Sequence, residues 1–309
     1  MIASFLTAAL LLSEAAKGQL FVANSGTGTI GEYSLSGAPI NISLVSGLNS
    51  PAALAYDGNG HLFVVNGGSG TVGEYSITGA TINAALVSGL FSPYAIAVDG
   101  SGNLFVSQGG PPYGQSNGSV GEYTSSGNIV NASLISGLAL PTALALDGNG
   151  HLFVGNWNLN GTIGEYTTSG TTVNSSLLQS PYTTGIALDG NGNMFVAQEL
   201  WSQVGEYTTT GATVNSSLIF NPYLAAPYGV SLDGNGHLFV TDWSQGTVGE
   251  YTTSGAIVNT SLINGLTNPD GIVIVVPEPS MVAFVAGGLV FLFRVKRAPG
   301  VLNSDFVVA

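Results

Sequence analysis

The sequence has no cysteine and almost no positive charge. Its 309 residues include four lysines and arginines against seventeen aspartates and glutamates. The absence of cysteine excludes disulfide bonds and thiol catalysis. The four cations, Lys17, Arg294, Lys296 and Arg297, all lie outside residues 18–276, a stretch that holds fourteen of the acids. Because phosphate backbones are bound through lysine and arginine, this composition excludes a nucleic-acid partner and disfavours anionic membrane surfaces.

What the sequence does contain is a repeat. The phrase Gly-Glu-Tyr, followed by serine or threonine, occurs six times, with successive spacings of 42, 48, 43, 41 and 44 residues. A period near 43 residues with several short strand-like runs in each copy is typical of a β-propeller blade. The glutamates of the six copies are Glu32, Glu74, Glu122, Glu165, Glu206 and Glu250.

Each copy divides into four strand-like runs separated by turn residues. In the second copy the runs are Pro51–Asp57, His61–Val65, Thr71–Ser76 and Thr81–Val87. They are short, rich in β-branched and aromatic residues, and bounded by glycine, asparagine and serine. We therefore expect four-stranded antiparallel blades, with the first run lining the channel and the fourth lying outermost.

The innermost strands show how the ring closes. Five of them precede a second strand, but the first blade begins directly at Gln19–Val22 and lacks an inner strand. Pro269–Val275 is a spare inner strand at the far end of the repeats. We expect it to complete the first blade, because closure removes the exposed sheet edges of an open array. The predicted fold is all-β, a six-bladed β-propeller over residues 18–276, closed by N- and C-terminal strands in one blade. The other inner strands are Pro51–Asp57, Tyr94–Asp99, Thr142–Asp147, Thr184–Asp189 and Tyr228–Asp233.

The order Pro-x-Gly-Ile-x-x-Asp, then Gly-x-Gly, then strands that end in Tyr-Ser or Tyr-Thr resembles the NHL-repeat and related six-bladed propellers. The resemblance covers nearly all of residues 18–276. Two features depart from the usual pattern: the aspartate that commonly ends the second strand occurs only at Asp242, and the arginine that commonly opens the third strand is absent. The resemblance is specific for fold and weak for activity.

The C-terminal sequence resembles a PEP-CTERM protein-sorting tail. Val276-Pro-Glu-Pro-Ser280 is followed by the apolar run Met281–Phe293 and the basic cluster Arg294–Arg297. As a helix, thirteen residues would span roughly 20 Å, short of the ~30 Å hydrocarbon core. The resemblance thus implies a sorting signal at residues 277–297 with a short transmembrane run, transient inner-membrane anchoring, and cleavage by an exosortase-type protease. A permanent single-span anchor is the alternative, and residues 298–309 form a further tail.

The N-terminal sequence fits export. Ile2–Leu12 is an apolar core and Ser13–Ala16 supplies small residues for cleavage, although no lysine or arginine precedes the core. We expect residues 1–17 to be a signal peptide. The expected location is the cell envelope, cell surface or extracellular matrix of a Gram-negative-type bacterium.

Aromatic residues that break the repeat are expected on one face of the ring, where the loops entering the inner strands meet the loops after the second strands. Aromatic rings stack on the C–H faces of sugars, and amide and carboxylate groups bond their hydroxyls. These residues therefore predict a surface that binds neutral glycan, although they could equally cover the interfaces between blades. They are Tyr94, Tyr113, Trp157, Tyr182, Trp201, Tyr228 and Trp243.

Three acids also break the repeat on that face: Glu199, Asp242 and Asp270. Oxygen ligands from separate blades could hold Ca²⁺; otherwise no cofactor is expected. By contrast, aspartates such as Asp57 and histidines such as His61 recur in register. We expect those aspartates to bond backbone amides in turns rather than a metal.

Two function classes follow. The first is a non-catalytic binding module, with extracellular polysaccharide or another protein as its partner, because the sequence has no evident set of nucleophile, base and orienting group. The second resembles gluconolactonase-type or streptogramin-lyase-type propellers, and would be a metal-dependent hydrolase or lyase. We favour the binding module, which is not an enzyme.

Overall fold

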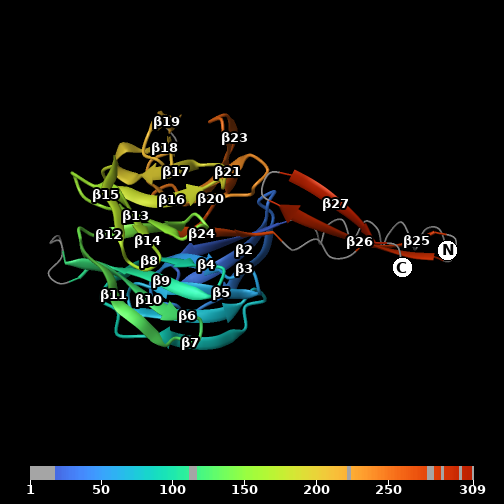
Figure 1. The fold of residues 1–309 in the computed structure, drawn as a ribbon, viewed down its shortest axis with the longest axis horizontal. Coiled ribbons are helices and arrows are strands. Elements are labelled where there is room, and N and C mark those ends of the chain that lie inside the picture. Colours follow the sequence, from blue (N-terminus) through green and yellow to red (C-terminus); the bar gives the residue numbers. More distant parts are fainter. Residues whose placement is uncertain are drawn as a thin grey trace.

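The computed structural model describes residues 18–110, 117–220, 224–276, 282–286, 289–298 and 301–307. Residues 18–276 form six four-stranded antiparallel sheets arranged as a propeller (Figure 1). The strands of each blade are given from the channel outward. The first blade is β24 (Pro269–Val275), β1 (Gln19–Asn24), β2 (Thr29–Ser34) and β3 (Pro39–Val45), the second is β4 (Pro51–Tyr56), β5 (His61–Asn66), β6 (Thr71–Ser76) and β7 (Thr81–Val87), and the third is β8 (Pro93–Val98), β9 (Asn103–Gln108), β10 (Gly118–Thr124) and β11 (Ile129–Leu138). The fourth blade is β12 (Pro141–Leu146), β13 (His151–Asn156), β14 (Thr162–Thr167) and β15 (Thr172–Gln179), the fifth is β16 (Thr183–Leu188), β17 (Asn193–Gln198), β18 (Gln203–Thr208) and β19 (Thr213–Phe220), and the sixth is β20 (Pro227–Leu232), β21 (His237–Asp242), β22 (Thr247–Thr252) and β23 (Ile257–Ile263).

The ring closes as the sequence predicts. Strand β24 pairs antiparallel with β1, with Gln19 opposite Val275 and Phe21 opposite Val273. N- and C-terminal strands therefore share the first blade, and the all-β, six-bladed prediction is confirmed.

The hydrophobic core lies between blades rather than within them. One cluster joins Phe63 and Val65 of the second blade to Leu104 and Val106 of the third. Another packs Leu20 and Val22 of the first blade against Phe239 and Val248 of the sixth, which seals the ring. Because each blade buries its apolar faces only against its neighbours, all six must be present for the core to exist.

The Gly-Glu-Tyr phrase has a packing explanation. In β6 the ring of Tyr75 folds over Gly73, and a Cβ placed on Gly73 would meet the ring at 2.7 Å. Tyr75 is buried, so it has little room to move aside. The same Gly–Tyr contact occurs in all six blades. The phrase is thus a structural element of the third strand and carries no functional assignment.

The Asn-x-Ser sequences of the outermost strands are also structural. In β3 the Oδ1 atom of Asn41 accepts a hydrogen bond of 3.2 Å from the backbone N–H of Ser43, and the pairing register with β2 shifts at this point. Asparagines make equivalent bonds in the other five blades. Such bulges interrupt the outer edge and protect it from pairing with another sheet.

Beyond the propeller, the chain forms strands where the sequence suggested a short helix. Strands β25 (Val282–Ala286), β26 (Leu289–Ala298) and β27 (Val301–Val307) make an antiparallel sheet that extends away from the blades (Figure 1). The apolar run is rich in valine and phenylalanine, which favour strands. Among the described residues, no helix is long and apolar enough to cross a membrane.

Candidate ligand-binding site at the channel mouth

Two sets of loops meet on one face of the propeller, as the sequence analysis expects. In every blade the first residue after the second strand donates its backbone N–H to the residue that precedes the inner strand; for Trp157 and Leu140 the distance is 2.8 Å. In five blades the accepting residue has a left-handed φ between 46° and 58° despite having a side chain. These non-glycine positions carry backbone strain, so the rim of the channel is held in a specific shape. They are Ser50, Ser92, Leu140, Tyr182 and Asn268.

This rim surrounds a cavity of about 710 Å³ at the mouth of the channel. The walls are the starts of the six inner strands, and backbone groups and small side chains make up much of the surface. Among the lining residues, the aromatic ones are Tyr94, Trp157, Tyr228 and Trp243, and the ionisable carboxyl group is that of Asp270. The volume suits a small organic ligand or one or two sugar rings.

The aromatic side chains are fixed by contacts with one another and with Glu199, which lies in the short 3₁₀ helix η1 (Glu199–Trp201). The Nε1–H group of Trp157 donates to Oε2 of Glu199 at 2.8 Å. The Tyr228 hydroxyl also bonds Glu199, and its ring stacks on Trp243 with a centroid distance of 6.1 Å. Tyr182 meets Trp157 edge to face at 5.4 Å. One carboxylate therefore organises aromatic residues from different blades.

Asp270 differs from Glu199 in its environment. Burial raises the pKa of Asp270 to about 7; a hydrogen bond from the Ser25 hydroxyl opposes the shift, and the negative charge of Glu199 adds to it. Burial also raises the pKa of Tyr228, and Glu199 and Asp270 strengthen this effect because they disfavour a further negative charge. Near neutral pH the cavity therefore contains a carboxyl group that is close to its titration point.

Asp242 has a structural role. Its side chain is only 2% exposed, and its two oxygens accept hydrogen bonds from the backbone N–H groups of Ala225, Ala226, Ser244 and Gln245. In the third blade Gln108 occupies the equivalent position and similarly accepts from the Phe91 amide. Asp242 therefore anchors the loop that enters the sixth inner strand and is not part of the cavity lining.

We expect Asp242→Ala to lower the free energy of unfolding by on the order of 3 kcal/mol, because four backbone amides, the buried one of Ala226 among them, lose their acceptor. Asp242→Asn, which places in blade six the amide found at the equivalent Asn66, should lose clearly less. Chemical denaturation of the two variants and the parent measures the difference. Equal stability of the alanine variant and the parent would contradict the anchoring role.

The structure brings some of the predicted site residues together and separates others. Tyr94, Trp157, Tyr228, Trp243 and Asp270 line the cavity. Tyr182 and Glu199 do not line the cavity, but both contact Trp157, which does. Trp201 is 48% exposed and does not line the cavity. The predicted site residue Tyr113 lies outside the described residues.

The three acids considered as metal candidates, Glu199, Asp242 and Asp270, have different surroundings. Among the described residues, no group of three or more His, Cys, Asp or Glu side chains is placed to hold a metal ion. Glu199 is bonded by Trp157 and Tyr228, while the oxygens of Asp242 are occupied by backbone amides. Ca²⁺ ligation by these three acids would have to compete with these hydrogen bonds.

Sequence reasoning missed the role of small residues in the channel wall. A Cβ on Gly229 would lie 2.6 Å from the carbonyl oxygen of Asp270, and a Cβ on Gly271 would lie 2.7 Å from Cα of Ala53. Neighbouring inner strands thus approach too closely for a side chain. Thr241 links the same region by donating its hydroxyl to the Asp270 carbonyl oxygen at 2.7 Å. Glycine inside an inner strand could have indicated this close approach of neighbouring backbones from the sequence alone.

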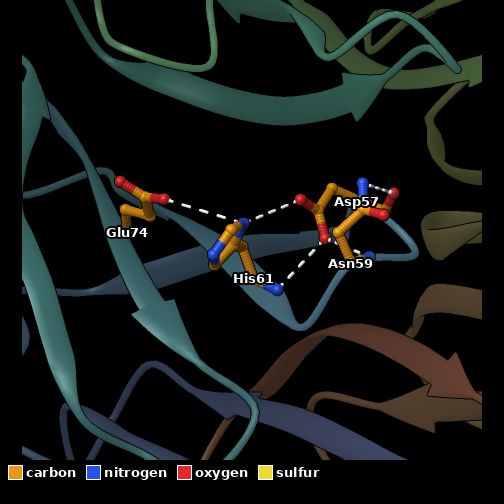
Figure 2. Close-up of polar contacts among 4 residues, drawn as sticks. All are labelled: Asp57, Asn59, His61 and Glu74. Atoms are coloured by element: carbon orange, nitrogen blue, oxygen red, sulfur yellow. Dashed lines mark hydrogen bonds and ion pairs between the residues drawn. The ribbon is translucent and has the colours of Figure 1, made fainter.

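The opposite face carries the repeated aspartates and histidines. Figure 2 shows Asp57 accepting backbone hydrogen bonds from Asn59 and His61, with the His61 Nδ1 atom 2.8 Å from Asp57 Oδ2 and 3.9 Å from Glu74 Oε1. Burial acts to raise the pKa of Asp57, but these hydrogen bonds outweigh it and hold the pKa below its usual value. The aspartates of this turn therefore stabilise the backbone, as the sequence analysis expects.

The model of the virginiamycin B lyase family matches residues 7–291, most of the chain. The chain belongs to this family. Both the match and the six blades fit the resemblance to NHL-like propellers. A comparison with curated proteins found no match to this member of the virginiamycin B lyase family.

Solved structures share the fold of this family member. A chain of a nidogen/laminin complex has a TM-score of 0.70 at 17% identity, covering 83% of this chain and 98% of that one. A protein of unknown function from Bacteroides caccae has a TM-score of 0.62 at 17% identity, covering 84% and 99%. A gluconolactonase from Xanthomonas campestris has a TM-score of 0.61 at 12% identity, covering 82% and 83%. At these identities the likeness is one of fold alone.

Proposed function

We propose that the protein is a non-catalytic binding module whose ligand occupies the channel-mouth cavity, with neutral carbohydrate as the ligand class. The observation that carries the proposal is the cavity itself, where Tyr94, Trp157, Tyr228 and Trp243 offer ring surfaces beside polar groups. Stacking on sugar C–H faces and hydrogen bonds to hydroxyls need no charged partner.

Two of the three acids that break the repeat, Glu199 and Asp242, are engaged in ways that favour binding over catalysis, whereas Asp270 lines the cavity with a pKa that burial raises to about 7. Glu199 is bonded by two aromatic side chains and Asp242 by backbone amides, so neither is placed to transfer a proton to a ligand. Within the described residues, the histidines that face acids, His61, His151 and His237, pair with the turn aspartates of the opposite face. A nucleophile with a base and an orienting group is not assembled in the described part of the cavity.

We expect Trp157→Ala to weaken binding of a neutral oligosaccharide by about 1–3 kcal/mol if the ring stacks on it. Trp201→Ala is the matched control, because Trp201 is exposed and lies outside the cavity lining. Isothermal titration of a panel of neutral sugars against the parent and both variants measures the effect. Equal losses in the two variants, or no sugar binding at all, would rule out the proposed site.

The second candidate function is a metal-dependent lyase or hydrolase, and membership of the virginiamycin B lyase family favours it. This function requires that a chelator abolish a lactone-opening or lactone-hydrolysing activity. Metal analysis of the purified protein, with activity measured before and after chelation, distinguishes it from the binding module. Chelator-sensitive activity without any sugar binding would replace the first proposal by this one.

We further propose that the protein is exported and is processed by an exosortase-type protease near residues 276–280. The order Pro-Glu-Pro, apolar run and basic cluster supports this proposal. Mass spectrometry of the protein from its native host is expected to find a C-terminus within this region. Peptides from residues 293–309 on the mature surface protein would argue against processing.

A further inference from the structure

The cavity combines negative charge with a complete lack of nearby positive charge. Residues 18–276 contain no lysine or arginine. The three histidines that contact carboxylates do so in the turns of the opposite face. An anionic ligand would therefore meet only acids, whereas a cationic ligand would meet no repulsion from any basic side chain of the propeller.

The carboxyl groups of Asp270 and Glu199 differ in their hydrogen-bond partners. Glu199 already accepts hydrogen bonds from the Trp157 indole and the Tyr228 hydroxyl. Asp270 lines the cavity itself, and the groups that influence its charge are the neutral Ser25 hydroxyl, which also donates to the Asn268 carbonyl oxygen at 2.9 Å, and the negative Glu199. A half-buried carboxylate that lacks a cationic partner gains stability when a ligand supplies one.

Aromatic rings surround the same space. Trp157, Trp243, Tyr94 and Tyr228 line the cavity with Asp270, and the Tyr228 and Trp243 rings stack with an interplanar angle of 26°. The face of an aromatic ring attracts a nearby cation, most strongly for tryptophan and in sites removed from water. Several rings together with one carboxylate form a set of groups suited to an organic ammonium ion.

We propose that this cavity selects ligands that carry an ammonium group, which binds against Asp270 with the aromatic rings around it. The proposal rests on the proposed function, in that it takes the channel mouth to be the ligand site. It departs from the neutral ligand class proposed above, because it assigns a positive charge to the ligand of the same cavity. An amino sugar and a simple alkylammonium compound share this chemistry, so both belong in the test.

The test compares matched ligands by isothermal titration on the full chain. Choline is paired with its uncharged isostere, in which a tert-butyl group replaces the trimethylammonium group, and glucosamine is paired with glucose. We expect the charged member of at least one pair to bind tenfold or more tightly than the neutral one. Preference in the glucosamine pair alone identifies an amino-sugar site, and preference in the choline pair identifies a general ammonium site.

Variants assign the preference to Asp270. Asp270→Asn removes the charge with little change in shape and should abolish the preference while neutral ligands still bind. Glu74→Gln removes the same charge beside His61 on the opposite face, and should leave the preference intact. If Asp270→Asn does not fold, titration of the parent at rising ionic strength replaces it, because screening weakens only the charged ligand.

The pH dependence provides a further check. Within the described residues, Glu199 and Tyr228 interact electrostatically with Asp270, and Tyr94 interacts with Tyr228; none of these groups is a base that becomes positive. Choline keeps its charge at every pH, so its affinity should rise between about pH 5.5 and about pH 8.5 as Asp270 ionises. The uncharged isostere should show no such rise.

The outcomes distinguish failure of the ammonium inference from failure of the proposed binding function. Equal binding of the charged and neutral members, in both pairs, overturns the ammonium inference and leaves the binding-module function standing. Failure of all four ligands to bind at millimolar concentration overturns the ammonium inference, while the wider sugar panel still decides the proposed function. A preference that persists in Asp270→Asn places the cation elsewhere and also refutes the inference.

Discussion

Deletion of residues 269–276 is expected to abolish cooperative folding of the propeller, or to lower its melting temperature sharply with aggregation. The deletion removes β24, which leaves the edge of β1 unpaired and uncovers the apolar contact of Ile272 with the sixth-blade cluster. Exposed strand edges pair with other chains. Circular dichroism during heating, with light scattering to follow aggregation, measures the outcome.

A truncation after Val276 provides the matched control, since it retains all 24 strands of the propeller. We expect it to melt as the full chain does. Gly271→Val is a milder test of the same closure, because a side chain there would collide with the backbone of Ala53 on the neighbouring inner strand. If the deleted chain melts like the control, then closure by β24 does not stabilise the ring.

Asp270→Asn is expected to make the protein more stable at high pH than the parent. The pKa of Asp270 is about 7 in the folded chain and its ordinary value is 3.8. The folded state therefore holds this proton more tightly, and its contribution to stability is fully present below pH 3.8 and is lost as the pH rises through about 7. The asparagine side chain does not ionise, so it avoids a penalty of at most on the order of 4 kcal/mol. Urea denaturation at about pH 4 and about pH 8.5 measures the gain.

Asp57→Asn is the control of opposite sign. Hydrogen bonds from Asn59 and His61 hold the pKa of Asp57 below its ordinary value despite burial, so its contribution is present above that value and is lost as the pH falls. This variant should lose stability at neutral pH and lose less in strong acid. A pH-independent effect of Asp270→Asn would show that its carboxyl group ionises normally in the folded protein.

The fold could be predicted because its determinants are local and repeated. The Gly58-Asn-Gly60 turn, the continuous buried run of β5, and the Gly73–Tyr75 contact each involve residues close in sequence. Six similar copies make the period visible, and the unmatched inner strand at Pro269–Val275 shows where the ring must close. The apolar C-terminal run was different: its length suggested a helix, but the structure has strands β25 and β26 there.

The candidate site could be predicted only in part. Sequence position placed the irregular aromatic residues and acids at one face, but it did not separate Trp157, which lines the cavity, from Trp201, which points to solvent. Nor did it distinguish three acids of similar chemistry. In the structure Glu199 orients aromatic rings, Asp242 binds backbone amides, and Asp270 lines the cavity.

The number of blades, the order of strands, the closing strand and the absence of lysine and arginine from residues 18–276 can all be read from the amino-acid sequence. Each of these follows from composition or from contacts within one blade, where residue spacing fixes geometry. Which side chains share the cavity, and how each acid is bonded, becomes evident from the folded arrangement of the blades alone. The reason is that contacts such as Trp157–Glu199, 42 residues apart, form between blades, and their geometry depends on how the blades are arranged around the channel.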